Sequence, residues 1–150
     1  RKDKDELFGY VRNACNEAGG IVMSIHSRRA STPVLDLLEQ YPGSGTPILH
    51  WFTGTVGELN RAISLGCWFS VGPAMLRSKK GRELTSRMPK ERVLTESDGP
   101  FAQLSGRPIL PWEVKDALNT LSELWGTDEN VVERKIMRNL ERLMDVGNKE

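Results

Sequence analysis

The sequence is poor in the features that mark several large classes of protein. Only two of its 150 residues are cysteines, Cys15 and Cys67, and their spacing fits neither a metal-binding pair nor a disulfide framework. We therefore interpret both as reduced, buried thiols of a cytoplasmic protein. No stretch approaches the roughly 18 apolar residues of a membrane span, and no signal peptide pattern opens the chain, so we expect no membrane partner.

An excess of charge of one sign is also absent. The 21 basic and 20 acidic side chains leave a net charge of +1, so binding of a polyanion has to come from local basic patches. With 38% apolar and 27% charged residues, the composition is that of a globular protein. We therefore predict a single domain over residues 1–150.

An initiator methionine is lacking, and the chain opens directly in a helical pattern of apolar residues that runs from Leu7 to Cys15. We therefore expect the sequence to enter its fold partway through. We expect it to be an expressed fragment, a cleavage product or part of a longer polypeptide.

Short apolar runs alternate with helical patterns along the rest of the chain. Strands are predicted within residues 21–27, 46–52, 67–73 and 92–98. Helices are predicted behind a cap at Thr32, with Pro33 at the first helical position, and within residues 55–66, 77–88, 111–126 and 127–144, the last capped by Thr127. This order predicts an α/β protein with a parallel sheet built from right-handed crossovers.

Three of the four predicted strands end in side chains that bind metal ions. The first ends at His26, the second at His50 and the fourth at Asp98. Since the carboxyl ends of parallel strands lie at one edge, with neighbours about 4.8 Å apart, these groups are candidates for one site. Such a nitrogen and oxygen set suits divalent zinc, manganese or magnesium. The alternatives are ordinary core or loop histidines, and a turn-forming aspartate before Gly99.

The motifs "SIHSRRA", "LHWFTG" and "LTESDGPF" resemble signature motifs of the TatD-type metal-dependent deoxyribonucleases, and the resemblance covers essentially the whole chain. It implies that His26, His50 and Asp98 bind one or two divalent ions and that the substrate is DNA. Details such as "GCWFSVGPAML" are similar to the TatD-like nucleases of Qat antiphage defence operons, which implies partners in a defence complex.

The family pattern also contains an "H-x-H" pair and a bridging glutamate, neither of which occurs before His26. A complete barrel of this type has about 250 residues. The resemblance therefore implies that the chain is the carboxyl-terminal half of a TIM (β/α)8 barrel. We expect this chain alone to be an incomplete enzyme, with the amino-terminal half in the same polypeptide or in a separate chain.

Further residues around these motifs are candidates for contacts with the substrate or with the metal-binding residues. Asp98 is a candidate to accept the proton of the attacking water, and Glu96 to support the metal ligands. Arg28 is a candidate to clamp a phosphate, and Trp51 to stack on a base, although aromatic residues at strand ends more often pack in the core. A basic cluster has two alternative interpretations, a surface that binds a nucleic-acid backbone or a solvated helix face. It comprises Arg77, Lys79, Lys80 and Arg82.

The sequence leaves three functions open. The first is metal-dependent hydrolysis of DNA phosphodiester bonds, in antiphage defence or elsewhere. The second is hydrolysis of an amide or ester on the same type of barrel, because a fold does not fix its substrate. The third is a half-barrel without activity that binds a partner.

Overall fold

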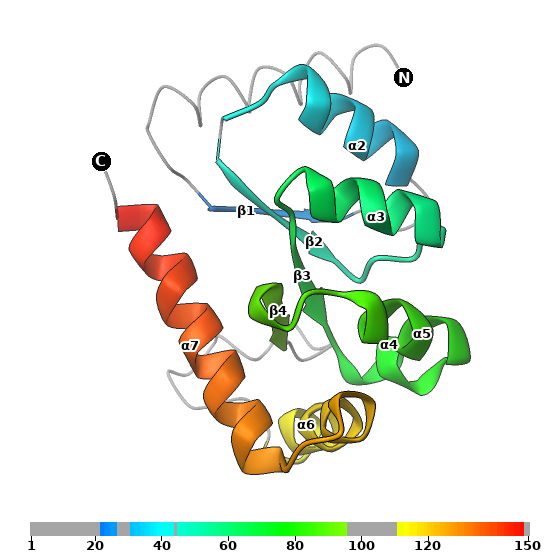
Figure 1. Ribbon diagram of the computed structural model, residues 1–150, viewed down its shortest axis with the longest axis vertical. Coiled ribbons are helices and arrows are strands. Elements are labelled where there is room, and N and C mark those ends of the chain that lie inside the picture. The colour runs from blue at the N-terminus through cyan, green and yellow to red at the C-terminus, as the bar shows by residue number, and fades with distance from the viewer. Residues whose placement is uncertain (1–21, 27–30, 44, 96–110, 149–150) are drawn as a thin grey trace.

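The computed structural model describes residues 22–26, 31–43, 45–95 and 111–148 (Figure 1). Its strands form one four-stranded sheet in which all neighbours are parallel and the spatial order follows the chain. They are β1 (Val22–His26), β2 (Thr46–His50), β3 (Trp68–Val71) and β4 (Val93–Thr95). Each lies within a range predicted from the sequence, so the predicted parallel α/β sheet is confirmed.

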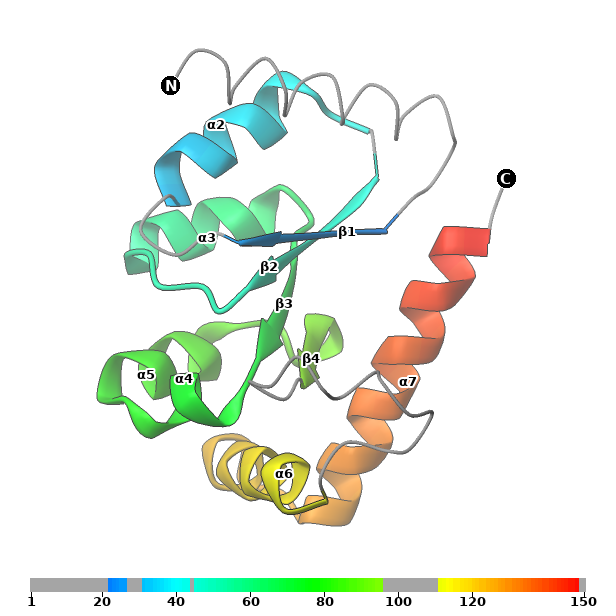
Figure 2. The same cartoon turned by 180° about the vertical axis from the view of Figure 1, so that it is seen from behind.

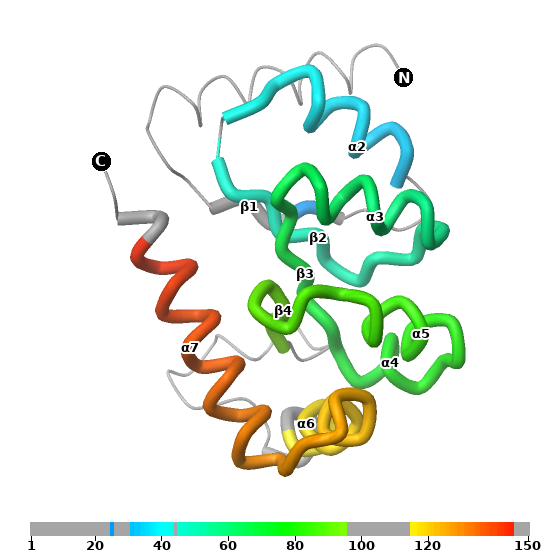
Figure 3. Tube along the Cα trace, in the orientation of Figure 1, coloured from blue at the N-terminus to red at the C-terminus, as the bar shows by residue number. Residues whose placement is uncertain are grey.

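Helices connect each described strand to the next, and two more described helices follow the last strand. The connecting helices are α2 (Ser31–Gln40), α3 (Val56–Ser64), α4 (Pro73–Arg77), α5 (Lys79–Arg87) and the short 3-10 helix η1 (Lys90–Arg92). Helices α6 (Pro111–Trp125) and α7 (Glu129–Asn148) follow β4. The chain steps from β1 to β4 through the connecting helices (Figure 3). Helices α2 to α5 lie on one side of the sheet and α7 lies on the other, as the two opposite views show (Figures 1 and 2). None of the described helices is long and apolar enough to cross a bilayer.

The two faces of the sheet are both apolar, which explains the nearly continuous apolar runs of the strands. One face contributes Leu49, Phe69, Val71 and Val93 to the main core, where each is fully buried against the helices. The other face carries Ile48, Trp68 and Leu94, which cluster with Leu143 of α7. Parallel strands covered on both faces lose the polar alternation of a solvated sheet.

Polar contacts fix helix α7 to the segment that enters β4. The buried amide of Asn139 donates through Nδ2 to the carbonyl oxygens of Lys90, at 2.7 Å, and Val93, at 2.8 Å. Arg142 donates to the Glu91 carbonyl at 2.9 Å, and its guanidinium lies 5.3 Å from the centre of the Trp68 ring. These bonds hold α7 across the sheet near the amino end of β4.

Two predicted helix starts are wrong. Helix α2 begins at Ser31, so Thr32 lies inside it and Pro33 is its third residue. Helix α7 begins at Glu129, so Thr127 does not cap it. Instead, Thr127 belongs to the turn after α6: its N–H donates to the Ser122 carbonyl, and the Ser122 hydroxyl donates to the Thr127 carbonyl.

The single basic helix predicted over residues 77–88 is broken at Ser78. Its hydroxyl accepts from the Gly81 N–H at 2.9 Å and donates to the Met75 carbonyl at 3.1 Å, so Ser78 caps α5 while ending α4. Gly81 packs directly against this junction. A side chain there would place its Cβ 1.9 Å from the Met75 carbonyl oxygen. The break therefore depends on Gly81 having no side chain.

Candidate metal site at the carboxyl end of the sheet

The last residues of β1 and β2 are the two histidines of the chain, and they are register partners. His26 pairs with His50, and His50 in turn pairs with Ser70 of β3. Adjacent strands of a sheet are about 4.8 Å apart, so these three backbone positions lie side by side at one level. The predicted convergence of the first two strand ends is thus observed for the backbone.

Ser70 contacts the ring of His50. Its hydroxyl oxygen lies 3.4 Å from His50 Nδ1, and the serine is almost fully buried, with 6% of its surface exposed. Its carbonyl accepts from the Trp51 N–H at 3.2 Å. Ser70 therefore orients both His50 and the residue after it. A polar side chain that fixes the ring of a histidine is a common support for a metal ligand.

The segment after His50 turns sharply and is held by aromatic packing. Trp51 has a φ of 48° and packs half-buried against the main core. Phe52 is buried and meets Phe69 edge to face, with ring centres 6.0 Å apart. At Gly54, a Cβ would lie 2.6 Å from the Phe52 ring and 2.9 Å from the Ser31 hydroxyl. The glycine of "HWFTG" is therefore required by close packing.

Glu58 joins the beginnings of α2 and α3. Its carboxylate accepts from the Thr55 N–H at 2.9 Å, completing a capping box, and from the Thr32 hydroxyl at 2.6 Å. The Thr32 bond, followed by the bonds to Thr55, holds the pKa of Glu58 below its ordinary value of 4.5. Because α2 follows β1 and α3 follows β2, this one carboxylate ties together the segments behind both histidines.

A basic side chain fixes the same segment from the third strand–helix unit. Lys80 of α5 donates to the Thr53 carbonyl at 2.8 Å. The predicted basic cluster of Arg77, Lys79, Lys80 and Arg82 is exposed, and Arg82 also donates to the Leu76 carbonyl at 2.8 Å. At least two of these cations thus have structural roles as well as a solvated face.

The structure describes only part of the remaining predicted site residues. Arg28, Glu96 and Asp98 lie outside the described residues, and His26 is described as part of a strand without its side chain. Among the side chains that the structure describes, no group of three metal-binding residues occurs. The predicted roles of these residues therefore stay predictions.

Sequence reasoning missed the residues that support the site. The pattern Thr55-Val-Gly-Glu58 is a capping box that is visible in the sequence, but its link to Thr32 is not. No sequence signal marks Ser70, and the basic cluster that contains Lys80 gives no sign of its bond to Thr53, because these contacts depend on the strand register and on the position of α5.

The parallel sheet, its alternating helices and the histidines at two strand ends define an α/β protein of the barrel type, with the candidate site at the carboxyl ends of the strands. Residues 1–145 match the family described as TatD related DNase, and the chain belongs to this family. The predicted resemblance is confirmed at the level of the family, and the predicted fold class is confirmed as a partial barrel.

Several named proteins are similar to this chain. The human protein "Deoxyribonuclease TATDN3" is 27% identical over 116 residues, which cover 74% of this chain and 41% of that protein. "Deoxyribonuclease Tat-D" of Schizosaccharomyces pombe is 31% identical over 84 residues, covering 53% of this chain and 26% of that protein. "Uncharacterized metal-dependent hydrolase YjjV" of Escherichia coli is 25% identical over 127 residues, which cover 81% of this chain and 49% of that protein.

Solved structures agree on the fold. The crystal structure of the Escherichia coli TatD homologue YJJV has a TM-score of 0.68 at 23% identity and covers 82% of this chain and 49% of that one. A TatD family hydrolase of Entamoeba histolytica has a TM-score of 0.69 at 18% identity, and the match covers 82% of this chain and 50% of that one. The chain thus spans about half the length of these structures, and less than half of the human and fission yeast relatives.

Proposed function

We propose that the complete protein is a metal-dependent nuclease that hydrolyses DNA phosphodiester bonds. The observation that carries the proposal is the register pairing of His26 with His50 in a chain of the TatD related DNase family. Two of the similar proteins are named deoxyribonucleases, which supports DNA as the substrate.

In this proposal His26, His50 and Asp98 hold one or two divalent ions, either magnesium, manganese or zinc. The backbone register supports the fit, since neighbouring strands bring two imidazole-bearing positions within reach of one ion, and Ser70 lies beside the His50 ring. A bound divalent ion supplies a nucleophile at neutral pH and offsets the charge that builds up on the phosphoryl oxygens.

The side chains of this chain have separate proposed tasks around the scissile phosphate. Asp98 accepts the proton of the attacking water, and Glu96 supports the ligands. Arg28 binds a substrate phosphate in a two-pronged contact. Trp51 contacts a base with the part of its ring that stays outside the core. The exposed cations of α5 lie beyond the end of β3 and favour a phosphate substrate over a neutral amide or ester.

We also propose that this chain is the carboxyl-terminal half of the barrel and that the amino-terminal half completes the site. The coverage of about half of the similar structures supports this. Helix α7 carries large apolar side chains that are about half exposed, namely Met137, Leu140 and Met144. A second half-barrel, upstream in the same polypeptide or in a separate chain, would cover such a surface.

We also propose a biological role and a cellular location for the enzyme. The resemblance of "GCWFSVGPAML" and "TESDGPF" to the Qat-associated nucleases supports a role in antiphage defence, with other defence proteins as partners. The full burial of the Cys67 side chain in the core supports a reducing, cytoplasmic location.

The experiment is cleavage of single-stranded and duplex DNA by the full-length protein with manganese or magnesium. We expect cleavage that stops with a chelator and that is lost in His50→Asn. Ester and amide substrates run in parallel. Hydrolysis of one of these without DNA cleavage would overturn the choice of substrate, and inactivity on all of them would favour the non-catalytic half-barrel.

A further inference from the structure

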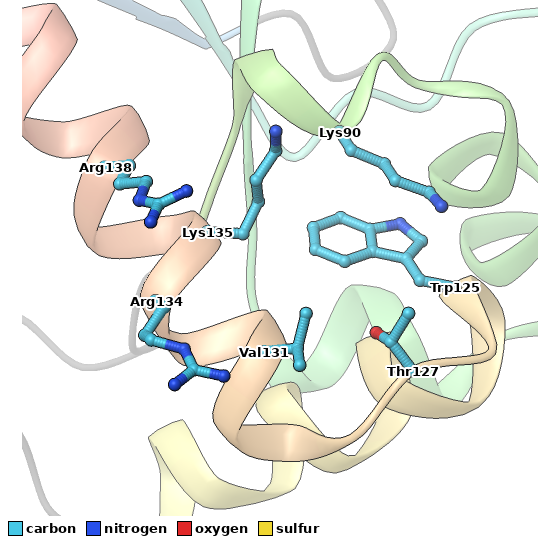
Figure 4. Close-up of a pocket in the computed structure, with 7 residues that line it drawn as sticks. All are labelled: Lys90, Trp125, Thr127, Val131, Arg134, Lys135 and Arg138. Carbon is cyan, nitrogen blue, oxygen red and sulfur yellow. The ribbon is translucent and has the colours of Figure 1, made fainter.

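A second candidate site lies away from the histidines, where α6, α7 and η1 meet. A cavity of about 420 Å³ there is lined by Lys90, Trp125, Thr127, Val131, Arg134, Lys135 and Arg138 (Figure 4). Lys90 precedes β4, whereas His50 is the last residue of β2, so the cavity is at the amino-terminal end of the sheet. The two sites therefore lie at opposite ends of the strands.

The lining of the cavity is strongly basic. Four of its side chains are cationic and none is acidic. One of them, Lys135, is partly neutralised by Glu91, since Lys135 Nζ lies 3.1 Å from Glu91 Oε1. In the part of the chain that the structure describes, no ion pair within 4.0 Å is found for Arg134 or Arg138. Such a concentration of positive charge in a concave site attracts an anion.

Trp125 adds an aromatic ring to this lining. Lys90 Nζ lies 6.0 Å from the centre of that ring. A flat ring beside cationic side chains suits a ligand that carries both an anionic group and a planar base.

Hydrogen bonds hold the walls of the cavity in place. The turn that carries Thr127 is fixed by the two bonds between Ser122 and Thr127, and the Lys90 carbonyl is held by the Asn139 amide. A wall fixed in this way loses little conformational entropy when a ligand binds.

From these features we propose that the cavity binds the phosphate group of a nucleotide, either free or as one unit of a DNA strand. Arg134 and Arg138 contact the phosphate oxygens, and the Trp125 ring packs against the base of the nucleotide. A cavity of this size is larger than a phosphate ion needs and is in the range of small-ligand sites. The proposal does not depend on the metal site or on DNA hydrolysis.

The test is binding of three probes to the full-length protein without divalent metal: inorganic phosphate, thymidine monophosphate and a short oligothymidylate. Titration calorimetry measures each affinity. We compare the double variant Arg134→Gln/Arg138→Gln and the variant Trp125→Leu, which removes the flat ring, with the control Arg87→Gln, an exposed arginine on α5 outside the cavity. Melting temperatures confirm folding, and the two glutamine replacements keep the side chains polar.

We expect the double variant to weaken binding of the phosphate probes by about tenfold or more, because it removes two charge-assisted hydrogen bonds. Trp125→Leu should weaken binding of the two thymidine probes severalfold and leave phosphate binding largely unchanged, and the control should change each affinity by less than about twofold. Binding of the mononucleotide assigns the cavity to a free nucleotide, and binding of the oligonucleotide alone assigns it to a strand. Equal losses in the control and the cavity variants, or the absence of saturable binding by all three probes, would overturn the proposal.

Discussion

His26 and His50 are register partners at the carboxyl ends of the parallel strands β1 and β2. They are the only two histidines in the sequence. Two parallel strands hold their register partners side by side. The fold therefore brings together His26 and His50, which are 24 positions apart in the sequence. The candidate metal site is built on this pairing and on the side chains that support it.

Ser70→Ala tests whether the serine positions His50. Loss of the hydroxyl beside Nδ1 should weaken divalent metal binding by about 10- to 100-fold, because residues that orient a ligand typically contribute that much. Calorimetry of metal binding to the full-length protein measures the change. The matched control is Ser86→Ala, which removes an exposed hydroxyl that donates to the Glu83 carbonyl of its own helix. Equal metal affinities in the two variants would contradict the positioning role.

Metal retention tests the half-barrel proposal. Since His26, His50 and Asp98 form only part of a coordination sphere, the 150-residue chain alone should lose its metal on dialysis, while the full-length protein keeps it. Elemental analysis of both after dialysis measures the difference. If the two retain equal stoichiometric amounts, the other half contributes no ligands and the proposal is wrong.

Gly81→Ala tests the packing at the α4–α5 junction. The new Cβ would lie 1.9 Å from the Met75 carbonyl oxygen, so the backbone must shift, at a cost of about 1–3 kcal/mol or more in the free energy of unfolding. Gly57→Ala is the control, because its Cβ would meet nothing nearer than the Thr55 hydroxyl at 3.8 Å. The control should be neutral or stabilise the helix by up to about 1 kcal/mol. Urea denaturation measures both, and equal effects would refute the close approach.

The acid dependence of stability tests the role of Glu58. Its pKa is lowered in the folded state, so the carboxylate stabilises the fold above its ordinary pKa of 4.5, and this contribution is lost as the pH falls through the folded value. Glu58→Gln keeps an acceptor oxygen but removes the charge. The melting temperature of the variant should therefore lie below that of the parent at pH 7, and the difference should shrink as the pH falls below 4.5.

The control for this titration is Glu123→Gln, an exposed position on α6. Its melting temperature should follow that of the parent throughout. A difference between Glu58→Gln and the parent that is the same at every pH would mean that the charge of Glu58 contributes nothing to the link between α2 and α3.

The strands were predictable because their signal is local. The run "TPILHWF" has a β-branched or apolar residue at most positions, and strand β2 occupies its first five residues. The strand ends at His50, and the chain turns at Trp51, with a φ of 48°. That His26 and His50 converge also followed from the sequence, since parallel strands end at a common edge.

The contacts that support the site were not predictable, because they join residues from different elements. The bond from Thr32 to Glu58 spans 26 residues, and it gives the Thr32 hydroxyl a partner in another helix where a cap of its own helix was expected. Lys80 reaches Thr53 across 27 residues. Local propensity depends only on the residues of one helix. The hydrogen-bond partners of Thr32 and Lys80 are determined by the packing of helices around the sheet.

Asp98→Asn in the full-length protein is the measurement that tests the central claim most directly. Asparagine keeps the size and the turn-forming ability of aspartate but removes the charge that binds metal and accepts a proton. Cleavage of single-stranded and duplex DNA with manganese or magnesium is compared with the parent, and melting temperatures are measured in parallel. The account predicts a loss of activity of about two orders of magnitude or more with the fold largely intact. Cleavage close to that of the parent would contradict it and would make "TESDGPF" an ordinary turn.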